Sequence, residues 1–286
     1  MYTLCFATTG GWDLSKGFGC ASLGLAGICD NTRQQTVTYP KELDGIVITG
    51  SYESVLTEVK AVNTAIHAAV VLFGNAGGEN DFLVRLQQIL PCPMVGGGAA
   101  IDGATGRKAL LTGGGEVALL LITDTRYQFE AVTKCIHNEI LEECTLTTAD
   151  PRTILTINGI DAATFLSEKR TQLRLAETDF EHLTLSDLRH VNAHLSLVDG
   201  VVKSGRDVHE KMLLRYVPHE QVYGTMKAFY DDKDAIVFGC AGLSGLLDKP
   251  LETSSLGLFL FGEVCTVDGK AEFGNLMLSK LRIVKK

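Results

Sequence analysis

The sequence predicts an α+β protein built from two subdomains, each a mixed or largely antiparallel sheet with flanking helices. Three observations predict this fold class. Apolar runs rich in β-branched residues alternate with stretches whose apolar residues recur every three or four positions. Glycine clusters follow many of these runs, and the 30 glycines are about one residue in ten, against a usual ~7%. The length of 286 residues suits one large domain or two ordinary ones.

In the first half of the chain, strand patterns and helix patterns alternate. The apolar residues between 52 and 69 recur with helical spacing and predict one helix. Residues 81–90 predict a second helix, capped by Asn80 or Asp81 and closed by Pro91. Strands are predicted at residues 3–8, 35–39, 45–49, 68–73, 94–95, 109–112 and 117–123, the last two as a hairpin around Gly113, Gly114 and Gly115.

In the second half, Asn158 and Gly159 form a strong turn signal after a predicted strand, and Asp161 is expected to cap a helix over residues 162–170. Residues 174–189 are densely charged and have little strand character. We therefore expect a domain boundary there, with domains at residues 1–172 and 173–286. Beyond it, a hairpin is predicted around residues 199–200, a helix at 220–230, and strands at 208–215, 235–239, 256–261 and 276–284.

Charge and composition exclude several classes of protein. The composition, 45% hydrophobic and 21% charged, is that of a globular chain rather than a disordered one. The net charge is −8 and no long basic run occurs, so we expect no nucleic-acid partner. The longest apolar stretch, residues 115–122, is too short to span a membrane, and the first ten residues do not resemble a signal peptide.

The eight cysteines include no CxxC pair, which is typical of reduced cysteines in a cytoplasmic protein. The seven histidines show no zinc-binding spacing, and His190 and His194 alone would not make a metal site. No Walker pattern, GxGxxG helix start or GxSxG elbow is present. We therefore expect neither a metal nor a cofactor.

Two glycine-rich segments have both a structural and a functional interpretation. Gly96, Gly97 and Gly98 predict either a tight turn at a strand end or a loop whose backbone N–H groups contact a ligand. Residues 73–79 leave a strand and enter a helix, so they form either a capped loop or a site where Asn75 and Glu79 hold the polar end of a small molecule.

Polar residues near the C-terminus interrupt apolar strands. Glu263 follows four apolar residues, and a carboxylate placed there must find a donor or reach a cleft. Asn275 would lie beside it if the two strands pair through a turn at residues 268–269. The two side chains either address a ligand or satisfy each other. Cys240 ends a buried strand and is either a reactive thiol or a small apolar core residue.

These segments resemble the FIST family. In that family an apolar strand ends in a cysteine, a Gly-Glu pair follows, and an asparagine precedes the last strand. The C-terminal resemblance lies in residues 234–242, in Leu260-Phe261-Gly262-Glu263 and in Phe273-Gly274-Asn275. Residues 93–99 and 157–162 resemble the N-terminal half of the family, in the same order along the chain. The chain departs from the family at Gly274, where a basic residue or histidine is common, and it is shorter than most members.

The resemblance implies an intracellular sensory module for small ligands, with amino acids or related polar metabolites as the expected class, and with a homo-oligomer or a signalling protein as possible partners. A site between the two halves is expected from Asn75, Gly97, Gly98, Cys240, Glu263 and Asn275. Glu263 would accept from an ammonium group, Asn275 would fix the ligand's orientation, and the amides of Gly97 and Gly98 would contact a carboxylate. Two alternatives remain open: a hydrolase or transferase that uses Glu263 or Cys240, and a scaffold that binds proteins.

Overall fold

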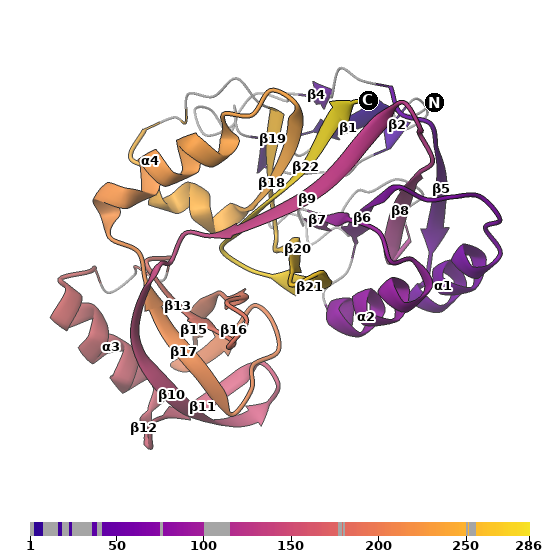
Figure 1. The fold of residues 1–286 in the computed structure, drawn as a ribbon. Coiled ribbons are helices and arrows are strands. Elements are labelled where there is room, and N and C mark those ends of the chain that lie inside the picture. Colours follow the sequence, from indigo (N-terminus) through magenta and orange to yellow (C-terminus); the bar gives the residue numbers. More distant parts are fainter. Residues whose placement is uncertain are drawn as a thin grey trace.

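The computed structural model describes most of the chain. The described residues are 3–7, 17–18, 23–24, 36–38, 42–74, 77–99, 115–176, 179, 181–249, 251 and 256–286. Within them, strands form sheets against which a few helices pack, so the predicted α+β class is confirmed (Figure 1).

The chain forms two units, one inserted into the other. The inserted unit, residues 139–216, contains every strand of the eight-stranded sheet. The chain enters and leaves it through neighbouring segments, because Glu139 pairs with Tyr216. We call the other described residues the sandwich unit (Figure 1, upper part). The expected division between residues 172 and 173 falls inside the inserted unit, since strands on both sides of it pair in one sheet.

One sheet of the sandwich unit contains β5 (Gly45–Gly50), β6 (Ala68–Phe73), β7 (Met94–Gly98), β8 (Val117–Ile122), β20 (Glu263–Val267) and β21 (Lys270–Gly274). Its order is β21-β20-β7-β6-β8-β5, and only β6 and β7 run parallel. Helices α1 (Tyr52–Lys60) and α2 (Glu79–Ile89) cover its outer face through apolar residues.

The second sheet of the sandwich unit contains β3 (Leu23–Gly24), β9 (Tyr127–Cys135), β18 (Ala235–Cys240), β19 (Leu256–Leu260) and β22 (Met277–Lys285). Its order is β3-β19-β18-β22-β9, with β18 and β19 parallel. Helix α4 (His219–Tyr230) and the 3₁₀ helix η4 (Ala241–Leu246) pack on its outer face. A separate small sheet pairs β1 (Thr3–Ala7) with β2 (Gly17–Phe18) and β4 (Thr36–Thr38).

The main core lies between the two larger sheets of the sandwich unit. Val70 and Leu120 on one sheet and Phe238 and Leu281 on the other belong to one buried cluster. Every residue of β6 and of β8 is buried, because both faces of their sheet are covered. The layers therefore run helix, sheet, sheet, helix.

The sheet of the inserted unit contains β10 (Glu139–Asp150), β11 (Thr153–Ile157), β12 (Ile160–Asp161), β13 (Leu183–Ser186), β14 (Asn192–Ala193), β15 (Leu195–Val198), β16 (Val201–Ser204) and β17 (Lys211–Tyr216). Its strand pairs are antiparallel. Helix α3 (Ala162–Leu173) buries Phe165 and Leu166 against this sheet. Asp161 caps α3 by accepting a 2.9 Å hydrogen bond from the Thr164 amide, as predicted.

The predicted helix over residues 52–69 was wrong in its second half. Helix α1 ends at Lys60, and β6 begins at Ala68. Val62 and Ile66 have helical spacing, but they pack from a connecting segment against the core under α1. The expected strand at 109–112, and with it the hairpin that it would form with 117–123, lies outside the described residues.

The glycine run 96–98 is neither a turn nor a loop, since it belongs to β7 in the interior of a sheet. A Cβ on Gly96 would lie 1.9 Å from the Val71 carbonyl oxygen. Glycine is therefore needed because two backbones approach closely, and not because the chain reverses.

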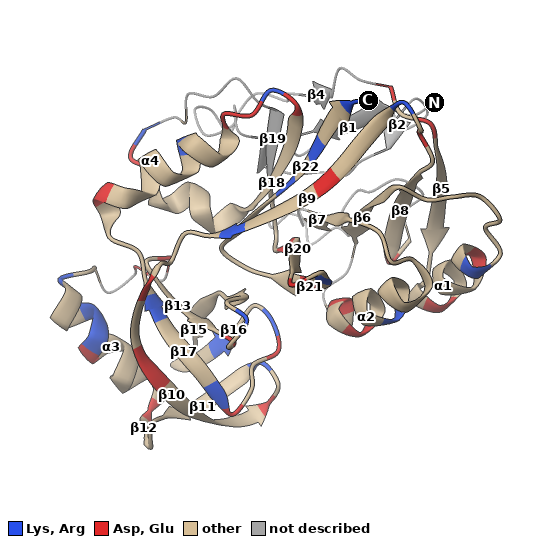
Figure 2. Cartoon of the chain, viewed as in Figure 1, with Lys and Arg blue, Asp and Glu red and all other residues tan. Residues whose placement is uncertain are grey.

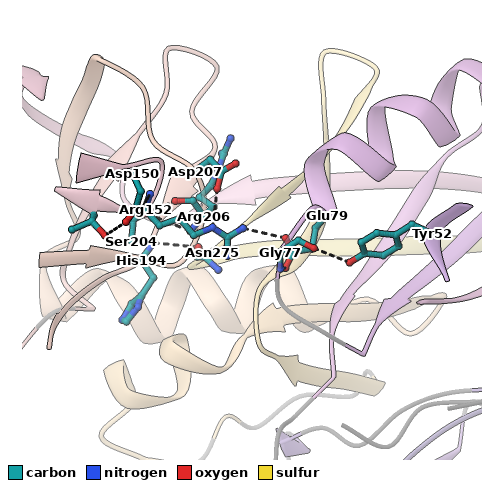
Figure 3. A network of polar contacts seen from close by, with 11 residues as sticks. Tyr52, Gly77, Glu79, Asp150, Arg152, His194, Ser204, Arg206, Asp207 and Asn275 are labelled. Atoms are coloured by element: carbon teal, nitrogen blue, oxygen red, sulfur yellow. Dashed lines mark hydrogen bonds and ion pairs between the residues drawn. The ribbon is translucent and has the colours of Figure 1, made fainter. Parts of the chain in front are cut away.

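An ionic contact joins the two units beside α2 (Figure 3). Glu79 is 3% exposed; its carboxylate accepts from the Gly77 amide at 2.8 Å and pairs with Arg152 of the inserted unit at 3.1 Å. Arg152 also pairs with Asp207 at 2.8 Å. Glu79 thus has the structural role that the sequence left open. Asn75 lies outside the described residues.

Charged residues are distributed over both units. In Figure 2 basic and acidic residues are interspersed along the visible strands and helices. None of the described helices has the length and apolar character that crossing a bilayer requires.

Candidate functional site

A cavity of about 380 Å³ lies at the junction of the two units. The inserted unit contributes Glu181, His194 and Gly205 to its lining. The sandwich unit contributes Cys240, Ala241, Gly242, Phe261, Gly262 and Asn275. Two of the residues predicted from sequence, Cys240 and Asn275, therefore line one cavity together. The site was expected between residues 1–172 and 173–286, whereas all the lining residues of this cavity belong to the second of those ranges.

Strand ends bring these residues together. Cys240 is the last residue of β18 and precedes η4, while Gly262 lies between β19 and β20. Asn275 follows β21, which pairs with β20 as the predicted hairpin. Opposite them, His194 lies between β14 and β15. Because each of these residues lies at or just beyond the end of a strand, not all of its backbone polar groups form hydrogen bonds to neighbouring strands.

Asn275 connects the two units at the cavity. Its side-chain oxygen accepts from the backbone N–H of His194 at 3.4 Å, and its backbone N–H donates to the Asn192 carbonyl at 3.0 Å. Gly205 leaves room for it, because a Cβ there would lie 2.5 Å from the Asn275 oxygen. The side chain of Asn275, which is 6% exposed, thus forms part of the cavity wall and also contacts the inserted unit.

Glu263 lies behind the cavity wall rather than in it. Its side chain is fully buried, and one carboxyl oxygen accepts from the Met277 amide. Burial raises the pKa of this carboxyl well above its ordinary value. A fully buried carboxyl that does not line the cavity cannot reach an ammonium group bound there, so that predicted role does not fit the geometry.

The Cys240 thiol is a weak nucleophile in this environment. Burial and the neighbouring Glu263 raise its pKa to about 12, although backbone hydrogen bonds from Leu276, Gly242 and Gly262 act in the opposite direction. Nucleophilic attack needs the thiolate, so the thiol is largely unreactive at neutral pH.

Two further buried acids lie close to Glu263. Burial and the Glu263 charge raise the pKa of both Tyr230 and Cys265 well above their ordinary values. A Cβ on Gly239 would lie 2.4 Å from the Tyr230 hydroxyl oxygen, so this hydroxyl fits closely against β18. Each of these groups, when ionised, disfavours ionisation of its neighbours.

Gly97 and Gly98 position the segment that carries Gly262. Residue Gly97 pairs with Glu263, and a Cβ on it would lie 2.2 Å from the Gly262 carbonyl oxygen. The Gly98 amide donates to that same oxygen at 3.1 Å. This amide is therefore occupied within the protein, and it does not contact a ligand carboxylate as predicted.

Glu181 and His194 are the polar residues that sequence reasoning missed. The two side chains approach each other at 3.9 Å between His194 Nε2 and a Glu181 oxygen. They are 31% and 29% exposed, respectively, more than the buried polar residues around them. Glu181 belongs to the charged stretch 174–189, where the sequence predicts a domain boundary, and no spacing in the sequence connects either residue to Cys240.

His137 holds the Glu181 backbone in place through a hydrogen bond. Its ring is fully buried; Nε2 donates to the Glu181 carbonyl at 2.6 Å, and Nδ1 accepts from the Asn192 amide group at 3.2 Å. These partners require one neutral tautomer. Burial accordingly lowers the pKa of His137 to about 4.

Acid is expected to destabilise the protein through His137. Because the folded pKa is depressed, its contribution is complete above the unfolded pKa near 6.5 and is lost as pH falls toward 4, by about 3 kcal/mol. Urea unfolding at pH 7, 5.5 and 4.5 measures this loss. We expect His137→Gln, which keeps a donor toward Glu181, to be less stable at pH 7 and to lose less on acidification. Equal losses in the two proteins would contradict the assignment.

A second, wider cavity of about 560 Å³ lies between α2 and β21. Its polar residues are engaged with one another: Gln87 bonds to Gly269 and Ala271, and Arg189 pairs with Glu272. The cavity that contains Asn275 and Cys240 is the better candidate site, because two of the residues that the sequence singles out line it, and none of those residues lines the wider cavity.

No protein-family model matches the chain, and no curated protein matches it. The FIST resemblance therefore remains a prediction from the residues that carry it.

Proposed function

We propose that this chain is a FIST-like sensory protein that binds a small polar metabolite, with amino acids and related amines as the first class to test. One observation carries the proposal. The cavity between the units is lined by polar side chains from both of them, Glu181 and His194 on one side and Asn275 on the other. Its volume, about 380 Å³, is in the range of small-molecule sites.

The position of the cavity supports a sensory role. A ligand that contacts Glu181 and Asn275 would touch both units at once, and so would favour the arrangement in which the units are joined. Ligand binding would then change the population of the joined arrangement, and a partner protein that binds only that arrangement would respond to the ligand. The partner would be a signalling protein or a second copy of the chain.

The residues behind the family resemblance also support the proposal. Cys240, Phe261, Gly262 and Asn275 line the cavity, and Glu263 lies directly behind it. Five cysteines, Cys92, Cys135, Cys144, Cys240 and Cys265, are free thiols, which fits the reducing cytoplasm that the sequence predicts. A hydrolase or transferase that attacks with Cys240 has less support, because the pKa of its thiol is raised to about 12.

A thermal-shift screen of amino acids, amines and other polar metabolites at millimolar concentration tests the proposal. At 100 times its Kd, a ligand stabilises the folded chain by about 2.7 kcal/mol. Ala241→Leu fills part of the cavity and should remove the shift. Ala228→Leu, on the exposed face of α4, should retain it. A screen without any stabilising compound would count against binding, and a shift that survives Ala241→Leu would place the ligand elsewhere.

A further inference from the structure

The charges around the cavity narrow the class of ligand. Among its nine described lining residues, Glu181 is the one with a formal charge, and none is lysine or arginine. We infer that the ligand is a small organic cation, a primary amine without a carboxylate, held by the Glu181 carboxylate. This inference rests on the proposed function and makes it more specific.

Two arginines of the inserted unit, Arg206 and Arg152, are engaged elsewhere. Arg206 follows Gly205 in the chain, but its guanidinium donates to the Val191 carbonyl at 3.2 Å and lies 3.5 Å from Asp187. Arg152 is held by Glu79 and Asp207. In Figure 3 the His194 ring points away from both guanidinium groups. Neither Arg152 nor Arg206 is therefore available to pair with a carboxylate bound near His194.

Several backbone donors at or beside the cavity are also occupied. The Gly98 amide bonds to the Gly262 carbonyl, and the amides of Gly242 and Gly262 bond to the Cys240 sulfur. A ligand carboxylate would lose its hydration, find few donors in exchange, and meet the negative charge of Glu181. Each of these effects disfavours a carboxylate.

The same lining suits an ammonium group. Glu181 is a charged acceptor, and charge-assisted hydrogen bonds of this kind are the stronger ones in proteins. Phe261 is 47% exposed and adds an aromatic ring to the wall, which can contact the apolar part of the ligand or the cation itself. The cavity thus offers an anionic end and an apolar side.

Matched compounds test the inference by isothermal titration calorimetry at pH 7 and low salt. Leucine is compared with 3-methylbutylamine, which lacks its carboxylate, and with 4-methylpentanoate, which lacks its amine. Phenylalanine, phenethylamine and 3-phenylpropanoate form a second series. We expect an amine to bind at least tenfold more tightly than its amino acid in at least one series, and neither acid to bind.

Glu181→Gln should weaken amine binding by at least tenfold, because it removes the charge while it keeps the shape. Glu210→Gln, at an exposed position of the same unit, should leave binding unchanged and is the matched control. Amino acids that bind as tightly as the amines, or amines that bind Glu181→Gln normally, would overturn the inference and leave the proposed function standing. If the amines fail while other polar metabolites stabilise the chain, only the inference fails. If nothing in either experiment binds, both proposals fail.

Discussion

Replacing Gly96 with alanine is expected to cost more than about 4 kcal/mol and to leave most of the chain unfolded or insoluble. The new Cβ would lie 1.9 Å from the Val71 carbonyl oxygen, which is backbone and cannot rotate away. The φ angle of Gly96 is +135°, where side chains are rarely tolerated. Urea unfolding followed by circular dichroism measures the loss, and the yield of soluble protein reports the extreme case.

Gly224→Ala is the matched control for this substitution. Gly224 lies within α4, and a Cβ there would meet nothing within 4 Å. Alanine should therefore stabilise the chain by about 1 kcal/mol through its higher helix propensity. If Gly96→Ala unfolds within about 1 kcal/mol of the original chain, β6 and β7 cannot approach each other as closely as described.

Glu263→Gln is expected to stabilise the protein at neutral and alkaline pH. The buried acid has a raised pKa, so its contribution to stability is complete below its unfolded pKa near 4.3 and is lost as pH rises. At a pH above both the unfolded and the folded pKa, the buried acid destabilises the fold in proportion to the difference between the two pKa values. Glutamine keeps an acceptor for the Met277 amide and has no proton to lose. The difference in the free energy of unfolding between Glu263→Gln and the original chain should grow with pH until Glu263 ionises in the folded state.

Thermal and urea unfolding at pH 4, 6 and 8 measure this dependence. The two proteins should be similar in stability at pH 4 and should diverge by pH 8. Glu210→Gln, which removes an exposed carboxylate, should show no such divergence. A Glu263→Gln protein that is less stable at every pH would mean that the carboxylate is ionised and paired in the folded state.

Local signals in the sequence were sufficient for several elements. Asn158 and Gly159 predicted the turn between β11 and β12, and Asp161 predicted the start of α3. The hairpin from β20 to β21 followed from a turn signal between two apolar runs. Each of these elements is formed by residues within about ten positions of one another. A local sequence pattern is therefore enough to predict it.

Features that depend on distant contacts could not be predicted in this way. The inserted unit is closed by pairing of β10 with β17, some seventy residues later in the chain. Glu181 and His194 reach Cys240 only through that arrangement. The run of Gly96, Gly97 and Gly98 predicts a turn or loop, because glycine usually marks one. Its true cause, two strands that pass too close for side chains, exists only once the sheet has formed.

The nested arrangement of the two units also determines the order in which the chain can fold during synthesis. The inserted unit has its own apolar core, formed by residues that all leave the ribosome together. The sandwich unit must wait, because β9 pairs with β22 and that strand is made more than 140 residues later. Until then β9 has an open edge and the core between the sheets lacks Leu281 and Ile283. We therefore expect nascent chains that stop before Met277 to protect the inserted unit from proteolysis while the flanking segments are cut.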